Sequence, residues 1–274
     1  MSHASAARFV RELVEGPITR PALLRWRRQH FLSSEGHGFY FGVFGSFAAA
    51  REWLPRSPEF HHEALAVEHI NVRTRQVFAY DYPMMWWLDK AFRNGARRIL
   101  DMGGSVGVHY YAYQAYIDMP PSMAWRIVEV PTMVAAGRRL AAERGVTALS
   151  FTDDLKAALT GAGADIWIGS GALQYMDDAR PGDLLRRCPE MPVHILLNKL
   201  PLYEGDDFVT TQNIGEGCFA PLHVFNHGRF IHDIEALGYS LRDRWVVHER
   251  SLYLPGHPER SFPSFTGLYF AAER

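Results

Sequence analysis

From residue 96 to the end of the chain, short apolar runs alternate with segments that have the apolar spacing of helices. Short apolar runs bounded by glycines or polar turns are typical of buried strands. Strands that alternate with helices predict a parallel sheet with both faces covered. Strands are expected at residues 97–103, 124–130, 147–151, 164–170, 193–200, 240–248 and 264–271. No helix separates the last two, so we expect them to form an antiparallel hairpin at one edge.

The helices expected between these strands complete an α/β fold of the Rossmann-like kind, mostly parallel and seven-stranded. They fall at residues 106–116, 132–144, 154–159, 183–187 and 225–237. Two of them end at a glycine, Gly145 and Gly238, as helices commonly do.

Residues 1–94 have a different character, and we predict a separate, mainly helical cap and lid in front of a cofactor-binding and catalytic domain at residues 95–274. Short helices are expected at residues 6–14 and 21–30, the second opened by Pro21. Residues 36–47 are rich in glycine and aromatic side chains, which suits a loop or a hairpin. Residues 60–88 are expected to be helical in their second half, and the aromatic side chains of this region offer a face for a homodimer.

Composition excludes several functional classes. Of 274 residues, 47% are apolar and 22% charged, as in folded soluble proteins, and the net charge of −1 gives no general attraction to nucleic acid or anionic lipid. No apolar run is long enough to cross a membrane, and no secretory signal precedes residue 28, so we expect a cytoplasmic protein. Cys188 and Cys218 form no disulfide framework or zinc spacing, and the histidines at 223, 227 and 232 form no HExxH motif, so no metal is expected.

The most informative segment is ILDMGGSVG at residues 99–107, where a strand, a glycine-rich turn and a helix follow one another. In an open parallel sheet, ligands bind beyond the carboxyl ends of the strands. Glycines let the backbone approach a ligand closely, and the free N–H groups of a helix start favour an anionic moiety. A tight turn without a ligand is the structural alternative.

Three acids stand where successive strands end. Asp101, directly before the glycines, suits an ammonium or sulfonium group and would repel a pyrophosphate, whereas dinucleotide loops carry their acid later. Glu129 can accept hydrogen bonds from both hydroxyls of a ribose, and Asp153 or Asp154 can accept one from an adenine amino group. Any one of these acids could be an ordinary surface residue, but together they favour a nucleoside with a positively charged tail.

This order of motifs resembles class I S-adenosylmethionine-dependent methyltransferases. A narrower resemblance, to the methyltransferases of bacterial surface-polysaccharide and natural-product gene clusters, rests on FGSFAAA at 44–50, DMGGSVG at 101–107, LQY at 173–175, TQNIG at 211–215 and HVFN at 223–226. It implies S-adenosylmethionine as the cofactor and S-adenosylhomocysteine as its product. The implied cofactor site comprises Asp101, Gly103, Gly104, Ser105, Gly107, Glu129, Val130, Asp153, Asp154, Gly169, Ser170 and Gly171. One position departs from the family's loop: Ser105 stands where a glycine is usual, and its side chain could crowd the cofactor or donate a hydrogen bond to it.

Candidate catalytic groups lie beyond the fourth and fifth strands. His223 and His227 titrate near neutral pH and suit a general base, although each could be a hydrogen-bonded loop histidine. Lys199 could bind an anionic substrate or polarise a carbonyl, or be a solvated loop residue. Tyr203 can form a hydrogen bond to a polar acceptor. The remaining acceptor-binding candidates are Gln174, Tyr175, Asn198, Gln212, Asn213 and Asn226, the last of which could instead cap a helix.

The leading hypothesis is therefore a methyltransferase acting on oxygen or nitrogen of a small molecule, sugar or secondary-metabolite intermediate. Nucleic acid is disfavoured as the acceptor, because there is no RNA-binding module and no Asn/Asp-Pro-Pro-Tyr motif. An NAD-linked oxidoreductase on a similar sheet is one alternative. A methyltransferase-like binding subunit without turnover is another.

Overall fold

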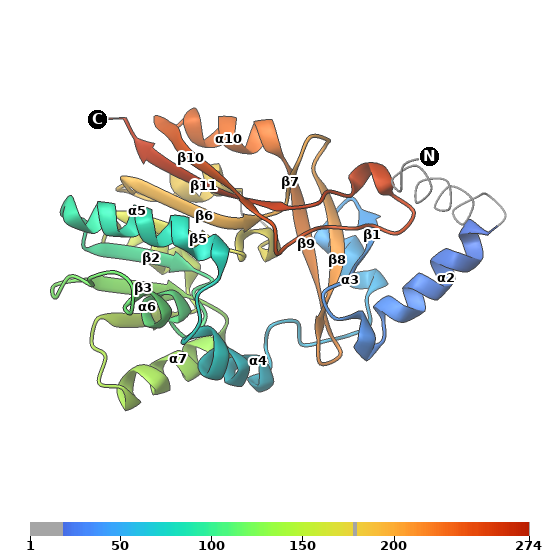
Figure 1. Cartoon of the computed structure of the whole chain (residues 1–274), viewed down its shortest axis with the longest axis horizontal. Helices are drawn as coiled ribbons and strands as arrows, with labels where there is room; N and C mark the ends of the chain where they lie inside the picture. Colours follow the sequence, from blue (N-terminus) through green and yellow to red (C-terminus); the bar gives the residue numbers. More distant parts are fainter. Residues whose placement is uncertain (1–18, 178–179, 274) are drawn as a thin grey trace.

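A computed structural model describes residues 19–177 and 180–273, so the helix predicted at residues 6–14 lies outside the described residues (Figure 1). The larger of two sheets has seven strands in the order β10-β11-β6-β5-β2-β3-β4. These strands are β2 (Arg98–Met102), β3 (Ala124–Val128), β4 (Leu149–Thr152), β5 (Ile166–Ser170), β6 (His194–Leu200), β10 (Tyr239–Val247) and β11 (Phe265–Ala272). Strands β2 to β6 are parallel, and β11 runs antiparallel to both β6 and β10. The predicted Rossmann-like sheet and its terminal hairpin are confirmed.

The helices that follow these strands occupy the predicted places with shifted ends. They are α6 (Val108–Tyr113), α7 (Pro131–Glu143), α8 (Leu155–Thr160), α9 (Pro181–Arg186) and α10 (His227–Glu235). The last begins two residues later than expected, because Asn226 still belongs to a strand and caps the helix by accepting a hydrogen bond from the backbone N–H of Arg229.

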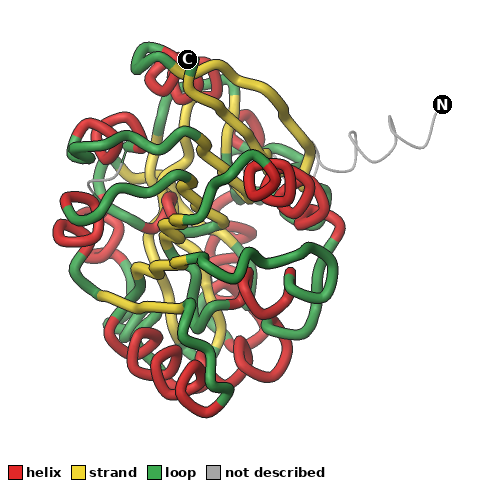
Figure 2. The backbone as a smooth tube through the Cα atoms, turned by 90° about the vertical axis from the view of Figure 1, so that its left-hand side faces the viewer, coloured by secondary structure: helices red, strands yellow, loops and turns green. Residues whose placement is uncertain are grey.

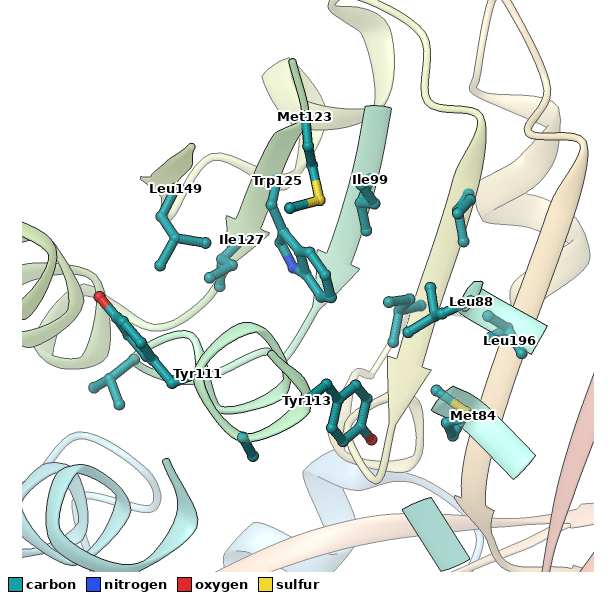
Figure 3. Packing of buried hydrophobic residues seen from close by; sticks show 14 of the residues in the cluster. Met84, Leu88, Ile99, Tyr111, Tyr113, Met123, Trp125, Ile127, Leu149 and Leu196 are labelled. Carbon is teal, nitrogen blue, oxygen red and sulfur yellow. The ribbon is translucent and has the colours of Figure 1, made fainter. Parts of the chain in front are cut away.

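Helices cover both faces of the large sheet (Figure 2), and apolar side chains from its two faces enter two separate cores. Ile99 packs on one face with Met84, Leu88 and Tyr113, beneath α5 (Tyr82–Arg93), α6 and α7 (Figure 3). Its neighbour Leu100 packs on the other face beneath α8, α9 and α10. Because side chains alternate along a strand, a strand that is apolar throughout can be buried on both faces.

The predicted boundary after residue 94 is crossed by this packing, since α5 belongs to the core of the large sheet. The region before α5 is less helical than expected. It contains α2 (Arg20–Phe31), α3 (Phe47–Trp53), α4 (Glu63–Glu68), the π-helix η2 (His69–Arg73) and the 3-10 turn η3 (Ala79–Asp81), but also the strand β1 (Tyr40–Phe44). The division into a cap and a catalytic domain stays a prediction.

Strand β1 belongs to a second sheet, in the order β1-β8-β9-β7, that sequence analysis did not predict. Its other strands are β7 (Leu202–Tyr203), β8 (Phe208–Gly215) and β9 (Cys218–Asn226). Tyr40 pairs with Gln212, far along the chain, so residues 36–47 form neither a simple loop nor a local hairpin. Strand β8 escaped detection because Thr210, Thr211, Gln212 and Asn213 are polar yet buried. This sheet stands at the end of the large sheet where β2 and β3 point (Figure 1).

Among the described residues, no helix combines the length and the apolar character needed to span a bilayer.

Candidate functional site

A cavity of about 670 Å³ lies between the carboxyl ends of the parallel strands and the segments that cover them. Strands β2 to β6 all contribute to one wall, through Gly103, Ser105, Val128, Glu129, Val130, Asp153, Ser170, Gly171 and Lys199. The opposite wall comes from the small sheet, from η2 and η3, and from the chain between β10 and β11. A cavity of this size at the ends of parallel strands is where such folds bind small ligands.

The glycine turn is tightly packed, and only part of it reaches the cavity. Gly103 has φ +70°, and a Cβ there would lie 2.1 Å from the Cβ of Ala172. A Cβ on Gly104 would lie 2.4 Å from Oδ2 of Asp101. Gly107 has φ +97° and faces Leu149 rather than the cavity. The glycines are therefore required for close packing, and of the three only Gly103 lines the cavity.

Asp101 does not lie where sequence analysis expected it. Its side chain is fully buried, and it is absent from the cavity wall. One carboxylate oxygen, Oδ2, lies 2.9 Å from Nδ1 of His109 and accepts a hydrogen bond from Nε1 of Trp125 at 3.1 Å. With Gly104 directly over the carboxylate, the side chain that reaches the cavity is that of His109. Asp101 therefore lies beneath the turn, where it contacts the imidazole of His109, and does not face the cavity.

Glu129, in contrast, lies at the cavity wall as expected. Its Oε1 accepts a hydrogen bond from the backbone N–H of Ser105 at 3.0 Å, and its Oε2 accepts one from that of Val130 at 2.9 Å. Burial raises the pKa of the Glu129 carboxyl to about 7, although these two N–H groups act in the opposite direction. The carboxylate is thus fixed in orientation by the backbone.

Ser105 reaches Glu129 because it adopts a left-handed conformation, with φ +54°. A non-glycine residue in this region costs conformational energy and persists only where its surroundings enforce it. The hydroxyl Oγ lies 2.6 Å from Nδ1 of His69, on the π-helix η2. The departure from the usual glycine therefore gives this loop a direct contact to the segment that covers the cavity.

The two aspartates after β4 have different places. Asp153 lines the cavity, whereas the side chain of Asp154 accepts a hydrogen bond from the backbone N–H of Ala157 and caps α8. After β5, Gly169 packs against Leu197 and does not line the cavity. Ser170 and Gly171 do line it.

Three of the four predicted catalytic residues lie outside the cavity. The Nε2 of His223 is 3.0 Å from the carbonyl oxygen of Asp177. The Nδ1 of His227 is 3.1 Å from the carboxylate of Glu204, and the hydroxyl of Tyr203 donates to the carbonyl oxygen of Asp206. Each contacts a partner outside the cavity. His223 lies within β9 and His227 is the first residue of α10, so neither histidine is a loop residue.

Lys199 is the predicted catalytic residue that does line the cavity. Its backbone has φ +55°, and its Nζ lies 5.2 Å from the centre of the Tyr80 ring. A Cβ on Gly171 would lie only 3.0 Å from Cε of Lys199, so the glycine makes room for the lysine. Burial, together with Arg73 and Arg250, lowers the pKa of Lys199 to about 8, against the opposing effect of Asp81.

The predicted acceptor-binding residues divide into two groups. Gln174, Tyr175 and Gln212 line the cavity, and the Tyr175 hydroxyl donates to Oε1 of Gln212. The three asparagines do not line it. Asn198 bonds the backbone of Tyr80 and Lys199, Asn213 bonds that of Phe31, Ser33 and Gly215, and Asn226 caps α10. Their amides connect loops to the two sheets, which is a structural role.

The fold can be compared with solved structures. An O-methyltransferase family protein from Burkholderia thailandensis superposes with a TM-score of 0.51 at 13% identity, over 94% of this chain and 71% of that one. The chain has the class I methyltransferase fold. Two further structures are similar at TM-scores below 0.5. They are the N-terminal domain of EvdMO1 with S-adenosylhomocysteine bound (0.48, 15% identity, 82% and 94% of the two chains) and magnesium protoporphyrin IX methyltransferase (ChlM) from Synechocystis PCC 6803 with S-adenosylhomocysteine (0.47, 14%, 91% and 99%). No family model matches the sequence, and no curated protein matches it either.

On this methyltransferase fold, several cavity residues come from segments that sequence analysis did not single out. His69 and Arg73 lie on η2, Tyr80 and Asp81 on η3, and Arg250 between β10 and β11. Burial, with Arg73 and Lys199, lowers the pKa of His69 to about 4, so this imidazole is neutral at neutral pH. No local sequence motif predicts these residues. The aromatic stretch around residue 80 was the one weak indication that this segment contributes to the site.

Within residues 19–177 and 180–273, no three His, Cys, Asp or Glu side chains gather as a metal-binding group.

Proposed function

We propose that this chain is an S-adenosylmethionine-dependent methyltransferase that acts on oxygen or nitrogen of a small molecule. The observation that carries the proposal is the Glu129 carboxylate, fixed at the end of β3 by the N–H groups of Ser105 and Val130. A carboxylate held in this way can accept hydrogen bonds from both hydroxyls of a ribose. Asp153, at the end of the next strand, is available to an adenine amino group.

The cavity also fits the amino-acid part of this cofactor. Oγ of Ser170 and Oε1 of Gln174 are buried, line the cavity and have no hydrogen-bond partner within the described protein. Buried polar atoms without a partner are costly, and unpaired atoms that line a cavity are available to the polar groups of a ligand. The ammonium and carboxylate of S-adenosylmethionine supply a donor and an acceptor for such atoms.

The glycine turn favours this cofactor over a dinucleotide. A pyrophosphate needs open glycine backbone. Here Gly104 and Gly107 do not line the cavity, so of the three glycines only Gly103 offers its backbone to a ligand. The buried negative charges of Asp101 and Glu129 nearby also disfavour a dianionic group.

When bound, S-adenosylmethionine supplies a methyl carbon on a sulfonium: the bond from this carbon to the acceptor forms as the C–S bond breaks, and sulfur keeps the electron pair. The protein's part is to align the acceptor and to remove its proton. Lys199 is the residue proposed for proton removal, because a pKa of about 8 leaves a useful fraction of its amine neutral near neutral pH. The arginines of the cavity stay protonated and cannot take this role.

Calorimetric titration with S-adenosylmethionine and S-adenosylhomocysteine tests the cofactor. We expect binding by the wild type, weakened about 100-fold in Glu129→Ala, since two charge-assisted hydrogen bonds are lost. The matched control is Glu143→Ala, an exposed acid on α7. Binding of NADH instead, seen as enhanced fluorescence, or equal affinity in Glu129→Ala, would contradict the proposal.

Turnover is tested separately with methyl-labelled cofactor and a panel of hydroxylated and amino small molecules, sugars included. Transfer of label to any of them supports a methyltransferase. Cofactor binding without transfer to any member would favour the binding-subunit alternative.

A further inference from the structure

We propose that the acceptor is an anionic small molecule, a planar ring bearing a carboxylate or a phosphate, and that Arg73 and Arg250 bind its anionic group. This inference rests on the proposed function, because Arg73 and Arg250 line the same cavity as Glu129.

Arg250 is the first observation. Its guanidinium lines the cavity and makes no hydrogen bond or ion pair to any described residue. Arginines that are partly buried are normally paired, and the guanidinium fork matches the geometry of carboxylates and phosphates. An unpaired guanidinium at a cavity wall therefore indicates an anion that comes from outside the protein.

Arg73 lies near the same place, and its own pairing is weak. Its Nε is 4.0 Å from a carboxylate oxygen of Glu68, whose side chain is 54% exposed. Its Nη1 donates to the hydroxyl of Tyr80 at 3.3 Å, and its guanidinium lies over the ring of Phe78 at 4.8 Å. Most of its donors remain available to a ligand.

Tyr80 connects these cations. Arg73 contacts its hydroxyl, and the Nζ of Lys199 lies over its ring. Burial raises the pKa of the phenol, and the charges of Arg73 and Arg250 oppose this rise. The nearest buried acid, Asp81, is already engaged on both oxygens, by the Tyr113 hydroxyl at 2.8 Å and the Phe78 backbone N–H at 2.9 Å. Among the described residues, the only acid that pairs with these cations is therefore the exposed Glu68, 4.0 Å from Arg73.

Aromatic side chains line the rest of this end of the cavity. Phe78 and Tyr80 stack with ring centres 5.4 Å apart, and Phe60 meets Tyr175 edge to face at 4.8 Å. Phe265 completes this wall. Flat aromatic surfaces pack well against a planar ring, which places the apolar body of the acceptor beside its anionic group.

The test uses the full chain saturated with S-adenosylhomocysteine and three probes of similar shape: benzoate, phenyl phosphate and uncharged benzamide. We expect at least one anion to bind about tenfold or more tightly than benzamide, the usual gain from a charge-assisted hydrogen bond. Preference for benzoate identifies a carboxylate, and preference for phenyl phosphate identifies a phosphate. Equal binding of benzamide and both anions would overturn the inference.

Variants locate the anion. Arg250→Gln and Arg73→Gln should each reduce the preference for the anion about tenfold, whereas Arg139→Gln, an exposed arginine on α7, should leave it unchanged. Affinity for S-adenosylhomocysteine reports whether each variant is folded, and either arginine variant suffices if the other is not. An equal loss in Arg139→Gln would show that the anions bind elsewhere.

The same titrations separate this inference from the proposed function. If the wild type binds S-adenosylhomocysteine but shows no preference for anions, the inference fails and the proposed function stands. If it does not bind S-adenosylhomocysteine, the proposed function fails, and titration of the unliganded chain decides whether the anion site exists.

Discussion

The two ends of the cavity are built in opposite ways. The end proposed for the cofactor comes from neighbouring parallel strands, its titratable groups, Glu129 and Asp153, are acids, and the backbone holds the Glu129 carboxyl in place. The end proposed for the acceptor comes from segments far apart in the chain, and its charges, on Arg73, Lys199 and Arg250, are mostly positive.

This difference shows that the two ends of the cavity depend on different parts of the fold. Strand ends in a parallel sheet lie side by side whatever their side chains are, so a cofactor end can be built by the sheet alone. The acceptor end depends on β1, η2, η3 and β8 folding over the sheet. Ser105 connects the two ends through its contact to His69 on η2.

The largest effect is expected where the cofactor end rests on the core. Asp101→Ala leaves His109 and Trp125 without their buried acceptor, and we expect the free energy of unfolding to fall by about 3 kcal/mol or more. Asp154→Ala, which removes only a helix cap, should cost about 1 kcal/mol. Urea denaturation of both variants measures this; similar losses would mean that Asp101 has no special place beneath the turn.

Glu129 tests whether the cofactor end is maintained at the expense of stability. Its ordinary pKa is 4.5 and its folded pKa is about 7. Because the pKa is higher in the folded state, the folded protein binds the proton of Glu129 more tightly than the unfolded chain does. This contribution to the free energy of unfolding is fully present below pH 4.5 and is lost as the pH rises to about 7. Above pH 7, Glu129→Gln should therefore stabilise the unliganded protein by roughly 2–3 kcal/mol, and by little at pH 4.5. Thermal unfolding at both pH values checks the sign, and a destabilised variant at pH 8 would refute it.

Lys199 sharpens the contrast at the acceptor end. Once an acceptor has been identified, the rate of methyl transfer should rise as the pH passes through about 8, where the Lys199 amine loses its proton. Lys199→Arg keeps the charge but cannot lose the proton, so kcat should fall about 100-fold and the rise should disappear. The control is Lys156→Arg, a lysine on α8. An unchanged pH profile in Lys199→Arg would assign proton removal to another group.

The smallest effect concerns the link between the two ends. Ser105→Ala keeps the left-handed backbone but loses the hydrogen bond to His69, and should cost about 1 kcal/mol. Ser105→Gly loses the same bond but relieves the backbone, so it should be closer to wild type in chemical denaturation. A glycine variant less stable than the alanine variant would mean that φ +54° carries no strain here.

Several of the residues that sequence analysis placed correctly at the cavity share a simple property. Gly103, Ser105, Glu129, Asp153 and Gly171 directly follow strands that periodicity reveals. Where sequence analysis was wrong, the local pattern was compatible with a side chain inside the cavity and with one outside it. Asp101 stands at the right strand end, but whether a side chain points above or below the turn depends on Gly104 and on Trp125 of the next strand. His223 and His227 have suitable chemistry, but β9 and α10 direct them to partners outside the cavity.

By itself, the sequence determined the seven-stranded sheet, the order of its helices and the edge at which the cavity lies, because apolar periodicity and strand ends are local properties. Only the tertiary structure decided which charges meet across the cavity. Arg73 and Tyr80 precede Lys199 and Arg250 by more than a hundred residues along the chain, and Tyr40 joins Gln212 through backbone pairing that no side-chain pattern reveals. Their proximity follows from the packing of one segment over another, a property of the whole folded chain.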